Sequence, residues 1–345
     1  MMKSKTSSYG QSILAGDIGG TKTNLAVYRR DWGPGEPVAE ATFPSGKYSG
    51  LEVMVREFLL QVEEKVDRAS FAVAGPVVNG EAKVTNLPWV MDERSLAQSL
   101  NLSSVNLLND ALAFAYAVPF LGKDDLYTLE RGRPDPGGAL AVVAPGTGLG
   151  EAYLTWDGPK YLAFPSEGGH ADFAPANALE VGLLNYLLDR FDHVSCERVC
   201  SGRGLANIYA YLKEAGYAEE PGWLAGELGS AIDPVPLIVK AALDETRPCS
   251  LCRATLDIFV SVLGAEAGNM CLKVMATGGV YLAGGIPARI LPALDQKEFM
   301  NSFRNKGRMS KLMERTPVHV VMNPKAALLG AACHGIGRTC NEQGS

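Results

Sequence analysis

The sequence predicts an α/β fold made of two similar halves. In each half a strand-like segment runs into a turn rich in glycine and threonine, and a second strand-like segment follows, over residues 12–29 and again over 139–156. Helical and strand-like patterns then alternate, which is typical of α/β domains. Because no low-complexity linker separates the halves, we expect two packed domains around a cleft.

The first half begins with expected strands at Ser12–Asp17, Asn24–Arg29 and Val38–Phe43. Apolar residues at helical spacing then predict a helix from Leu51 to about Val66, and Ser49 with Glu52 has the pattern of a capping box before it. The other elements expected here are a strand at Ser70–Ala74, a hairpin at Asn79–Gly80, a strand at Val105–Leu108, and a helix at Ala111–Val118 that Pro119 ends.

The second half repeats this order of elements. Strands at Ala139–Ala144 and Glu151–Trp156 flank the turn Pro145–Gly150. Asn177 and Glu180 form a further capping-box pattern, which predicts a helix to about Arg190. Helices are also expected at Leu205–Ala215 and Leu251–Lys273, a strand at Val280–Ala283, a short helix from Pro287, and a last helix that begins at Asn323–Pro324 and ends near Gly337.

Composition and charge argue against nucleic acid and membranes as partners. Lys and Arg total 32 and Asp and Glu total 38, so the net charge is −6 and sequence-independent binding to either polyanion is not expected. The polar N-terminal segment has no signal-peptide pattern, and no uninterrupted run reaches the roughly 20 apolar residues of a membrane span. The 7 cysteines follow no disulfide rhythm. We therefore expect a cytoplasmic protein with reduced thiols, in which Cys249 and Cys252 are packing residues and not zinc ligands.

Glycine is abundant: the chain has 38 in 345 residues, about 11%, whereas the usual share is about 7%. The glycines are also clustered. The clusters follow predicted strands. Glycine permits positive φ and lets backbone N–H groups approach an anion, so such turns suit nucleotide phosphates. None matches a P-loop or a dinucleotide fingerprint, and any one alone is explained as an ordinary turn. Twin Gly/Thr turns in similar hairpins favour a phosphate site; the clusters are Gly16/Gly19/Gly20, Gly146/Gly148/Gly150 and Gly284/Gly285.

Polar residues at the ends of predicted elements are the candidates for chemistry. Asp17 either shapes its turn or holds Mg²⁺ through water, and Asn109–Asp110 is either a helix cap or an oriented general base. The loop Glu167–Asp172, with His170 in it, has the acceptors and donor that suit a polyol; a metal site or a structural histidine is the alternative. Glu197 is explained by the residues alone as a carboxylate in a first helical turn.

Taken in order, these motifs resemble those of bacterial glucokinases, which are sugar kinases of the actin/hexokinase-like superfamily. The resemblance covers about residues 12–337 and rests on Gly16–Thr21, Leu107–Asp110, Gly146–Gly150, Ser166–Phe173, Glu197–Val199 and Ala283–Ile286. It implies a two-domain actin-like ATPase (ribonuclease H-like) α/β fold with a central cleft. The implied domains are a small α/β domain of residues 1–118 plus 323–345 and a large α/β domain of residues 119–322.

The resemblance also implies an activity and roles for individual residues. The activity is ATP-dependent phosphorylation of the 6-hydroxyl of D-glucose, which yields glucose 6-phosphate and ADP and feeds glycolysis. Asp110 would be the general base, and Asn109, Glu167, His170 and Glu197 would hold glucose hydroxyls. Mg²⁺ would be held through water near Asp17, with no direct protein ligand. ATP would be bound by Gly16, Asp17, Ile18, Gly19, Gly20, Thr21, Gly146 and Thr147, with Gly284 and Gly285 near the adenosine.

Two alternatives stay open: a hexokinase of broader specificity that acts on mannose, fructose or an amino sugar, and a sugar-sensing regulator without turnover. A DNA-binding regulator of this type needs a helix-turn-helix ahead of the first glycine cluster, for which we expect no room. The related repressor/kinase group has a zinc motif after its histidine, whereas Ala171–Phe173 follows His170 here. The expected partners are glucose, ATP and a second copy in a homodimer. The sugar range, phosphoryl donor, oligomeric state and the effect of Lys22 and Pro145 are not revealed by the sequence.

Overall fold

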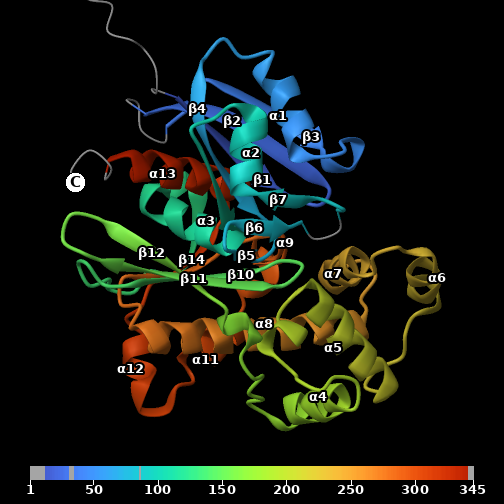
Figure 1. The fold of residues 1–345 in the computed structure, drawn as a ribbon. Helices are drawn as coiled ribbons and strands as arrows, with labels where there is room; N and C mark the ends of the chain where they lie inside the picture. The colour runs from blue at the N-terminus through green and yellow to red at the C-terminus, as the bar shows by residue number, and fades with distance from the viewer. Residues whose placement is uncertain (1–11, 31–34, 85–86, 341–345) are drawn as a thin grey trace, which may run out of the picture. The chain divides into compact units, whose positions relative to one another are not determined.

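In the computed structural model, the structure describes residues 12–30, 35–84 and 87–340. The chain forms two compact units, one of Met1–Gly122 with Asn323–Ser345 and one of Lys123–Met322 (Figure 1). Each unit is built on its own central sheet. The mixed α/β character predicted from the sequence is therefore confirmed.

The sheet of the first unit has the strand order β3-β2-β1-β4-β8. Strands β1 and β2 form an antiparallel hairpin that β3 extends, and β4 and β8 run parallel to β1. The hairpin is the predicted pair around the first Gly/Thr turn. The bounds are β1 (Ser12–Ile18), β2 (Lys22–Arg29), β3 (Ala39–Pro44), β4 (Val66–Val73) and β8 (Ser104–Asn109).

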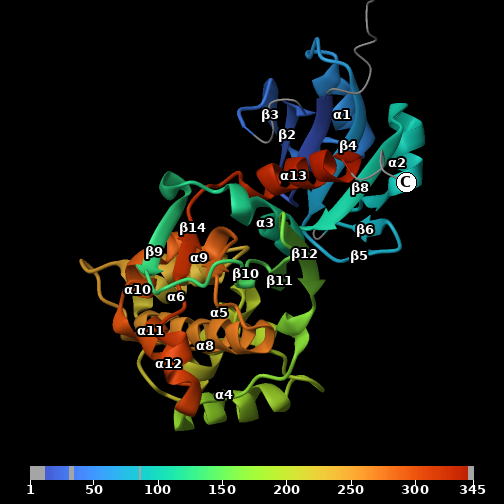
Figure 2. The same ribbon diagram turned by 90° about the vertical axis from the view of Figure 1, so that its left-hand side faces the viewer.

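Both faces of this sheet are covered, because successive side chains of a strand point to opposite faces. On β1, Leu14 packs into the core cluster that includes α1, whereas Ile13 and Ala15 pack into the cluster that includes α3 and α13. These helices are labelled beside the sheet strands in Figure 2. A small sheet of β5-β6-β7 belongs to the same unit. The remaining bounds are β5 (Val77–Val78), β6 (Glu81–Lys83), β7 (Val90–Asp92), α1 (Leu51–Leu59), α2 (Glu93–Leu100), α3 (Asp110–Ala117), α13 (Ala326–Cys340), and the 3-10 helices η2 (Ser45–Lys47) and η3 (Val118–Phe120).

The sheet of the second unit repeats this arrangement. Its order is β12-β11-β10-β13-β14-β9, where β10, β11 and β12 pair antiparallel and β13 and β14 continue parallel to β10. The first five strands thus have the same order and directions as the sheet of the first unit, and β9 is an added antiparallel edge strand. The bounds are β9 (Leu126–Glu130), β10 (Leu140–Pro145), β11 (Leu149–Trp156), β12 (Tyr161–Ser166), β13 (Gly279–Leu282) and β14 (Val318–Val321).

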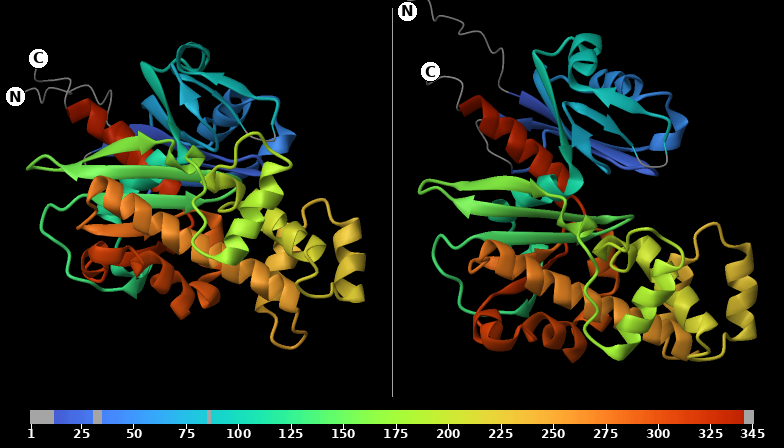
Figure 3. Two further views of the ribbon diagram at one scale, coloured as in Figure 1. Left: turned by 90° about the horizontal axis from the view of Figure 1, so that it is seen from below. Right: turned by 60° about the horizontal axis from the view of Figure 1, so that its bottom comes forward.

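Helix α8 (Ser250–Val274) is the central helix of the second unit and is packed by α5, α7 and α11 (Figure 3). Among the described residues it is the only helix long and apolar enough to span a membrane, and 72% of its most apolar window is buried inside the protein. A buried core helix explains that pattern. The other helices are α4 (Ala178–Leu188), α5 (Gly202–Glu214), α6 (Gly222–Ser230), α7 (Val235–Leu243), α9 (Gly285–Arg289), α10 (Leu291–Leu294), α11 (Lys297–Arg304), α12 (Ser310–Met313), η4 (Lys123–Asp125), η5 (Gly168–His170), η6 (Cys196–Arg198) and η7 (Gly307–Met309).

Local signals at helix starts have mixed outcomes. The N-cap predicted at Asn177 is confirmed, since the Glu180 N–H donates to Asn177 Oδ1 at 3.0 Å, and the Glu180 carboxylate accepts the N–H of Ala176 at 2.7 Å in place of the Asn177 N–H of a full capping box. The capping box predicted at Ser49 is wrong, because Gly50 is the N-cap of α1 and no side chain caps it. The predicted extension of α1 to Val66 is also wrong. The helix ends at Leu59, Leu60 is 88% exposed, and Val66 instead begins β4.

The cysteine pair at the start of α8 has a packing role. Cys249 and Cys252 are buried free thiols. Cys249 is the N-cap of α8, and its Sγ accepts the backbone N–H of Cys252 at 3.5 Å. This agrees with the expectation that the two cysteines are packing residues.

Candidate active site

The first Gly/Thr turn joins β1 to β2 and is held by a residue that the sequence analysis missed. The Gly19 N–H donates to the Lys22 carbonyl at 3.1 Å, which closes the turn. The Ser45 hydroxyl donates to the Gly19 carbonyl at 2.7 Å and also bonds the Thr23 hydroxyl at 3.0 Å. Ser45 is fully buried and is the first residue of η2, so η2 stabilises this turn through its hydrogen bonds. No local pattern identifies Ser45, which is 26 residues from Gly19 in the chain.

Residues 16–21, which the resemblance assigns together to ATP binding, include both buried and accessible residues. A Cβ on Gly16 would lie 2.6 Å from Phe71, and the Ile18 side chain is fully buried in the core. Gly16 is therefore required for packing, and any contact of Gly16 or Ile18 with a ligand is limited to backbone atoms. Thr21 is exposed, and Gly19 and Gly20 are half-buried. These last three residues form the accessible part of the turn.

Two carboxyl groups of the first unit have raised pKa values. Asp17 ends β1 and accepts a hydrogen bond from Asn24 Nδ2 at 3.3 Å. Burial raises the pKa of Asp17, an effect that the Asn24 bond and the Lys22 charge oppose. Asp110 is the first residue of α3, and burial, together with the nearby charge of Asp17, raises its pKa to about 6 against the opposing bond from the Ala111 N–H.

Asn109 caps the helix that carries Asp110. Its Oδ1 accepts the Ala111 N–H at 2.9 Å, and its Nδ2 donates to the Gly75 carbonyl at 3.1 Å. The capping interpretation is therefore confirmed. The Asn109 side chain also bonds the Asp110 carboxyl group, which opposes the rise in the pKa of Asp110. Because an amide oxygen has two acceptor sites, Asn109 Oδ1 keeps one for a ligand.

The second Gly/Thr turn joins β10 to β11 and is attached to two other segments. The Gly146 N–H donates to the Gly148 carbonyl at 2.8 Å, and the Gly146 carbonyl accepts the N–H of Gly202, the first residue of α5, at 2.8 Å. Glu197 Oε2 accepts the Leu149 N–H at 2.9 Å. A Cβ on Gly148 would lie 2.3 Å from the same oxygen. The turn and Glu197 are therefore in direct contact.

The third glycine cluster lies beside this turn. Gly284 follows β13 with a φ of +85°, and a Cβ there would lie 3.0 Å from the Pro145 carbonyl oxygen. Gly285 begins α9 and is exposed. The fold thus brings two of the three predicted glycine clusters together within the second unit.

The predicted polar loop forms η5 and packs on β11. A Cβ on Gly169 would lie 2.2 Å from the Leu149 carbonyl oxygen, so only glycine permits this approach. Glu167 and His170 have side chains that are 74% and 60% exposed, with 3.9 Å between Glu167 Oε2 and His170 Nε2. Asp172, the third polar residue of the loop, instead bonds His193 at 2.9 Å.

His170 and Glu197 line the same cavity of about 420 Å³ in the second unit. Arg190, Phe191, Asp192, His193, Ser195 and Arg198 line the rest of it. The sequence analysis did not single out this basic and aromatic lining. Its residues come from the segment after α4, where no motif marks them, and from η6, where Arg198 lies within the Glu197–Val199 motif.

Comparison with known proteins identifies the family of this chain. The glucokinase family model matches residues 14–336. The chain is 42% identical over 335 residues to the glucokinase of Trichormus variabilis, with 93% of this chain and 97% of the relative covered. It is 40% identical over 348 residues to the glucokinase of Synechocystis sp., with 94% and 97% covered.

Solved structures agree as well. The glucokinase from an Antarctic psychrotroph has a TM-score of 0.79 at 32% identity, covering 95% of this chain and 99% of that one. The ROK family glucokinase from Streptomyces griseus, solved in complex with glucose and AMPPNP, shares the fold with a TM-score of 0.63 at 19% identity, covering 94% and 99%. These similarities confirm the actin-like two-domain fold. The chain therefore belongs to the bacterial glucokinase family.

Proposed function

We propose that this glucokinase, which phosphorylates D-glucose with ATP, uses Asp110 as its general base. The observation that carries this proposal is the half-buried carboxyl of Asp110 at the start of α3, with a pKa of about 6. Such a group is ionised at neutral pH and is a stronger base than an ordinary aspartate. It takes the proton of the glucose 6-hydroxyl. The sugar oxygen then bonds to the γ-phosphorus, the bond to the β–γ bridging oxygen breaks, and ADP leaves.

We assign the glucose hydroxyls to Asn109, Glu167, His170 and Glu197. Asn109 Oδ1 has one free acceptor site beyond its capping bond to the Ala111 N–H. Glu197 uses Oε2 for Leu149, so Oε1 stays available, and the cavity that it shares with His170 is lined by polar and aromatic groups. Such a lining suits a polyol, which needs several placed hydrogen-bonding groups.

For ATP, we assign the phosphates to Gly19–Thr21 and Gly146–Thr147, with Asp17 beside them and Gly284–Gly285 near the adenosine. Among the described residues, no three His, Cys, Asp or Glu side chains gather as a metal site. A single carboxylate nevertheless fits Mg²⁺, which keeps several waters and binds through phosphates and one or two carboxylates. Asp17 would hold the ion through water, and the ion would neutralise charge on the phosphates.

We also propose that the enzyme is cytoplasmic, that it forms a homodimer, and that its product enters glycolysis. The free, buried thiols of the described cysteines suit a reducing compartment. The homodimer stays a prediction, which size-exclusion chromatography with light scattering would test.

A coupled assay with ATP and a panel of hexoses tests the proposed specificity. We expect the highest kcat/KM with glucose. A higher value with mannose, fructose or an amino sugar would favour the broader hexokinase, and sugar binding without turnover of any hexose would favour a sensor. The same assay with other nucleoside triphosphates and polyphosphate identifies the phosphoryl donor.

A further inference from the structure

Glu151 is a buried carboxyl group that the proposed mechanism does not use. It lies on β11, where it pairs with Val143 of β10 and Ser166 of β12, and it is only 2% exposed. Among the residues that the structure describes, neither of its carboxyl oxygens makes a hydrogen bond of ordinary distance and angle. A buried charge without a partner is costly, whereas a neutral carboxyl group is far less so.

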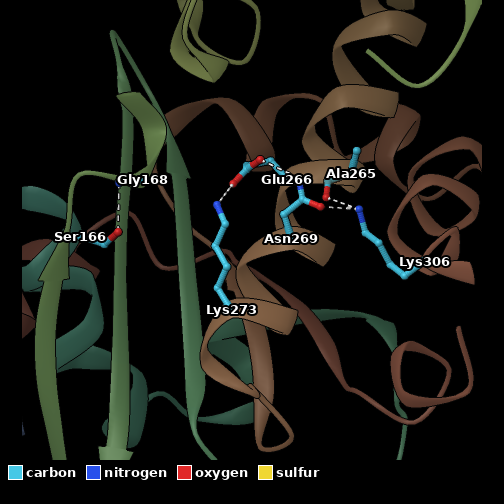
Figure 4. Close-up of polar contacts among 7 residues, drawn as sticks. All are labelled: Ser166, Gly168, Ala265, Glu266, Asn269, Lys273 and Lys306. Carbon is cyan, nitrogen blue, oxygen red and sulfur yellow. Dashed lines mark hydrogen bonds and ion pairs between the residues drawn. The ribbon is translucent and has the colours of Figure 1, made fainter. Parts of the chain in front are cut away.

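The side chain of Glu151 lies directly under the loop assigned to glucose. A Cβ on Gly168 would lie 2.0 Å from Glu151 Oε2, so the backbone of η5 rests against the carboxyl group. The Gly168 N–H points elsewhere, because it donates to Ser166 Oγ at 3.0 Å (Figure 4). The turn between Glu167 and His170 therefore packs on Glu151 without giving it a hydrogen-bond donor.

The cation that acts on Glu151, Lys273, is shared with a second carboxyl group. Glu266 of α8 is the carboxyl group whose charge acts on Glu151, and Lys273 pairs with Glu266, with 3.4 Å between Nζ and Oε1 (Figure 4). Lys306, on the far side of Glu266, bonds Asn269 and the Ala265 carbonyl and not a carboxylate.

The remaining titratable neighbour is Cys196 of η6. Its hydrogen bond with Cys200, and burial, raise the pKa of its thiol, which keeps it neutral. One lysine thus faces two carboxyl groups. Burial, followed by the charge of Glu266, raises the pKa of Glu151 to about 8 against the opposing charge of Lys273.

We propose that Glu151 is a positioning residue of the glucose site, which holds the Gly168–His170 turn in its binding geometry only while its carboxyl group is uncharged. The inference rests on the proposed assignment of Glu167 and His170 to glucose. On ionisation the carboxylate needs water or a cation, and the turn packed on it must move to admit either. Glucose binding then falls, while ATP binding does not depend on this turn.

The test is the pH dependence of the two KM values in the wild-type enzyme. Since a group with a pKa near 8 is about nine-tenths ionised at pH 9, the glucose KM should rise about tenfold from pH 7 to pH 9. The KM for ATP should stay level over that range. Glu151→Gln keeps the size of the side chain without its charge, so its glucose KM should match the wild type at pH 7 and should not rise at pH 9.

Two further variants test the direction of the pKa shift and provide a control. Glu266→Gln removes a negative neighbour, which lowers the pKa of Glu151, so the rise in glucose KM should begin at lower pH. Glu180→Gln is the matched control: Glu180 is equally buried, at 2% exposed, but it bonds Ala176 and Asn177 away from this loop. It should keep the wild-type alkaline rise.

Calorimetry gives a second readout that needs no variant. Glucose binding to wild-type enzyme at pH 8 should take up about half a proton, measured from the dependence of the binding enthalpy on buffer. The inference is overturned by a level glucose KM from pH 7 to 9, by an unchanged rise in Glu151→Gln, or by binding without proton uptake. Glu167→Gln separates the two proposals: if it leaves the glucose KM at pH 7 unchanged, the assignment of the loop to glucose fails, whatever Glu151 does.

Discussion

The carboxylate of Glu197 accepts a hydrogen bond from the backbone N–H of Leu149, with 2.9 Å between Oε2 and N. This bond joins η6 to the Gly146–Gly150 turn, so one side chain serves two proposed ligands. It supports the turn assigned to the phosphates and offers its second oxygen to glucose. The roles are separable by substitution.

Glu197→Gln keeps an oxygen that can accept the Leu149 N–H but removes the charge toward glucose. Because a hydrogen bond to a charged group is worth about 1.5–3 kcal/mol, the glucose KM should rise roughly tenfold to a hundredfold with the ATP KM nearly unchanged. Glu197→Ala also releases the turn, so both KM values should rise. Steady-state kinetics with each substrate varied would check this; a rise in the ATP KM alone in Glu197→Gln contradicts the assignment.

Glycines 146 and 148 of the same turn should respond differently to alanine. A Cβ on Gly148 would lie 2.3 Å from Glu197 Oε2, whereas a Cβ on Gly146 would meet nothing within 4 Å. We expect Gly148→Ala to lower the free energy of unfolding by about 1–3 kcal/mol, measured by chemical denaturation. Gly146→Ala should unfold like the wild type but raise the ATP KM, since a methyl group keeps phosphate from the backbone. An unchanged ATP KM in Gly146→Ala would remove Gly146 from the phosphate site.

Removing the proposed base should lower the turnover number without lowering the stability of the fold. We expect Asp110→Ala to lower kcat by about 10²–10⁴ with glucose still bound. Its Tm should not fall, because Asn109 still accepts the Ala111 N–H and a desolvated carboxylate is removed. A variant that keeps a tenth or more of the wild-type kcat would reduce Asp110 to a structural role.

The pH profile gives an independent check of the same group. The base works only when ionised, so kcat/KM should be level at neutral pH and should fall about tenfold per pH unit below about 6, where Asp110 protonates. An acid limb near the ordinary aspartate pKa of about 4 would contradict the raised pKa.

The helix that carries Asp110 depends on a close contact with the last helix. A Cβ on Gly330 of α13 would lie 1.7 Å from the Ala113 carbonyl oxygen of α3, whereas a Cβ on Gly337 of the same helix would meet nothing within 4 Å. Gly330→Ala should destabilise the protein by at least about 1–3 kcal/mol and lower kcat by displacing α3. Gly337→Ala should stabilise it by about 0.5–1 kcal/mol. Equal unfolding midpoints for the two variants would contradict this packing argument.

Features with a local cause were predictable from the sequence. The β1–β2 and β10–β11 hairpins follow from apolar strands around Gly/Thr turns, and the cap of α3 by Asn109 follows from the side-chain chemistry at a strand end. The start of the last helix is similar, since Asn323 Oδ1 accepts the Lys325 N–H at 2.8 Å just before α13.

Features with a distant cause were not predictable. Strand β14 has four residues and exists through its pairing with β13 and β9. Helix α1 ends at Leu59 although apolar residues continue at helical spacing, because Val66 pairs with β1 instead. Local propensity is a weak guide where strand pairing decides.

The candidate site divides in the same way. The sequence by itself determined the family motifs, the twin turns and the residue types of the proposed base and sugar ligands, because these are written in short contiguous segments. Only the tertiary structure decided that Ser45 braces Gly19, that Glu197 holds the second turn, and that Glu151 lies unpaired under the Gly168–His170 turn. Each of these contacts joins residues brought together by sheet pairing and helix packing, and burial there changes the hydrogen bonding and pKa of a side chain whose surroundings its neighbours in the sequence do not define.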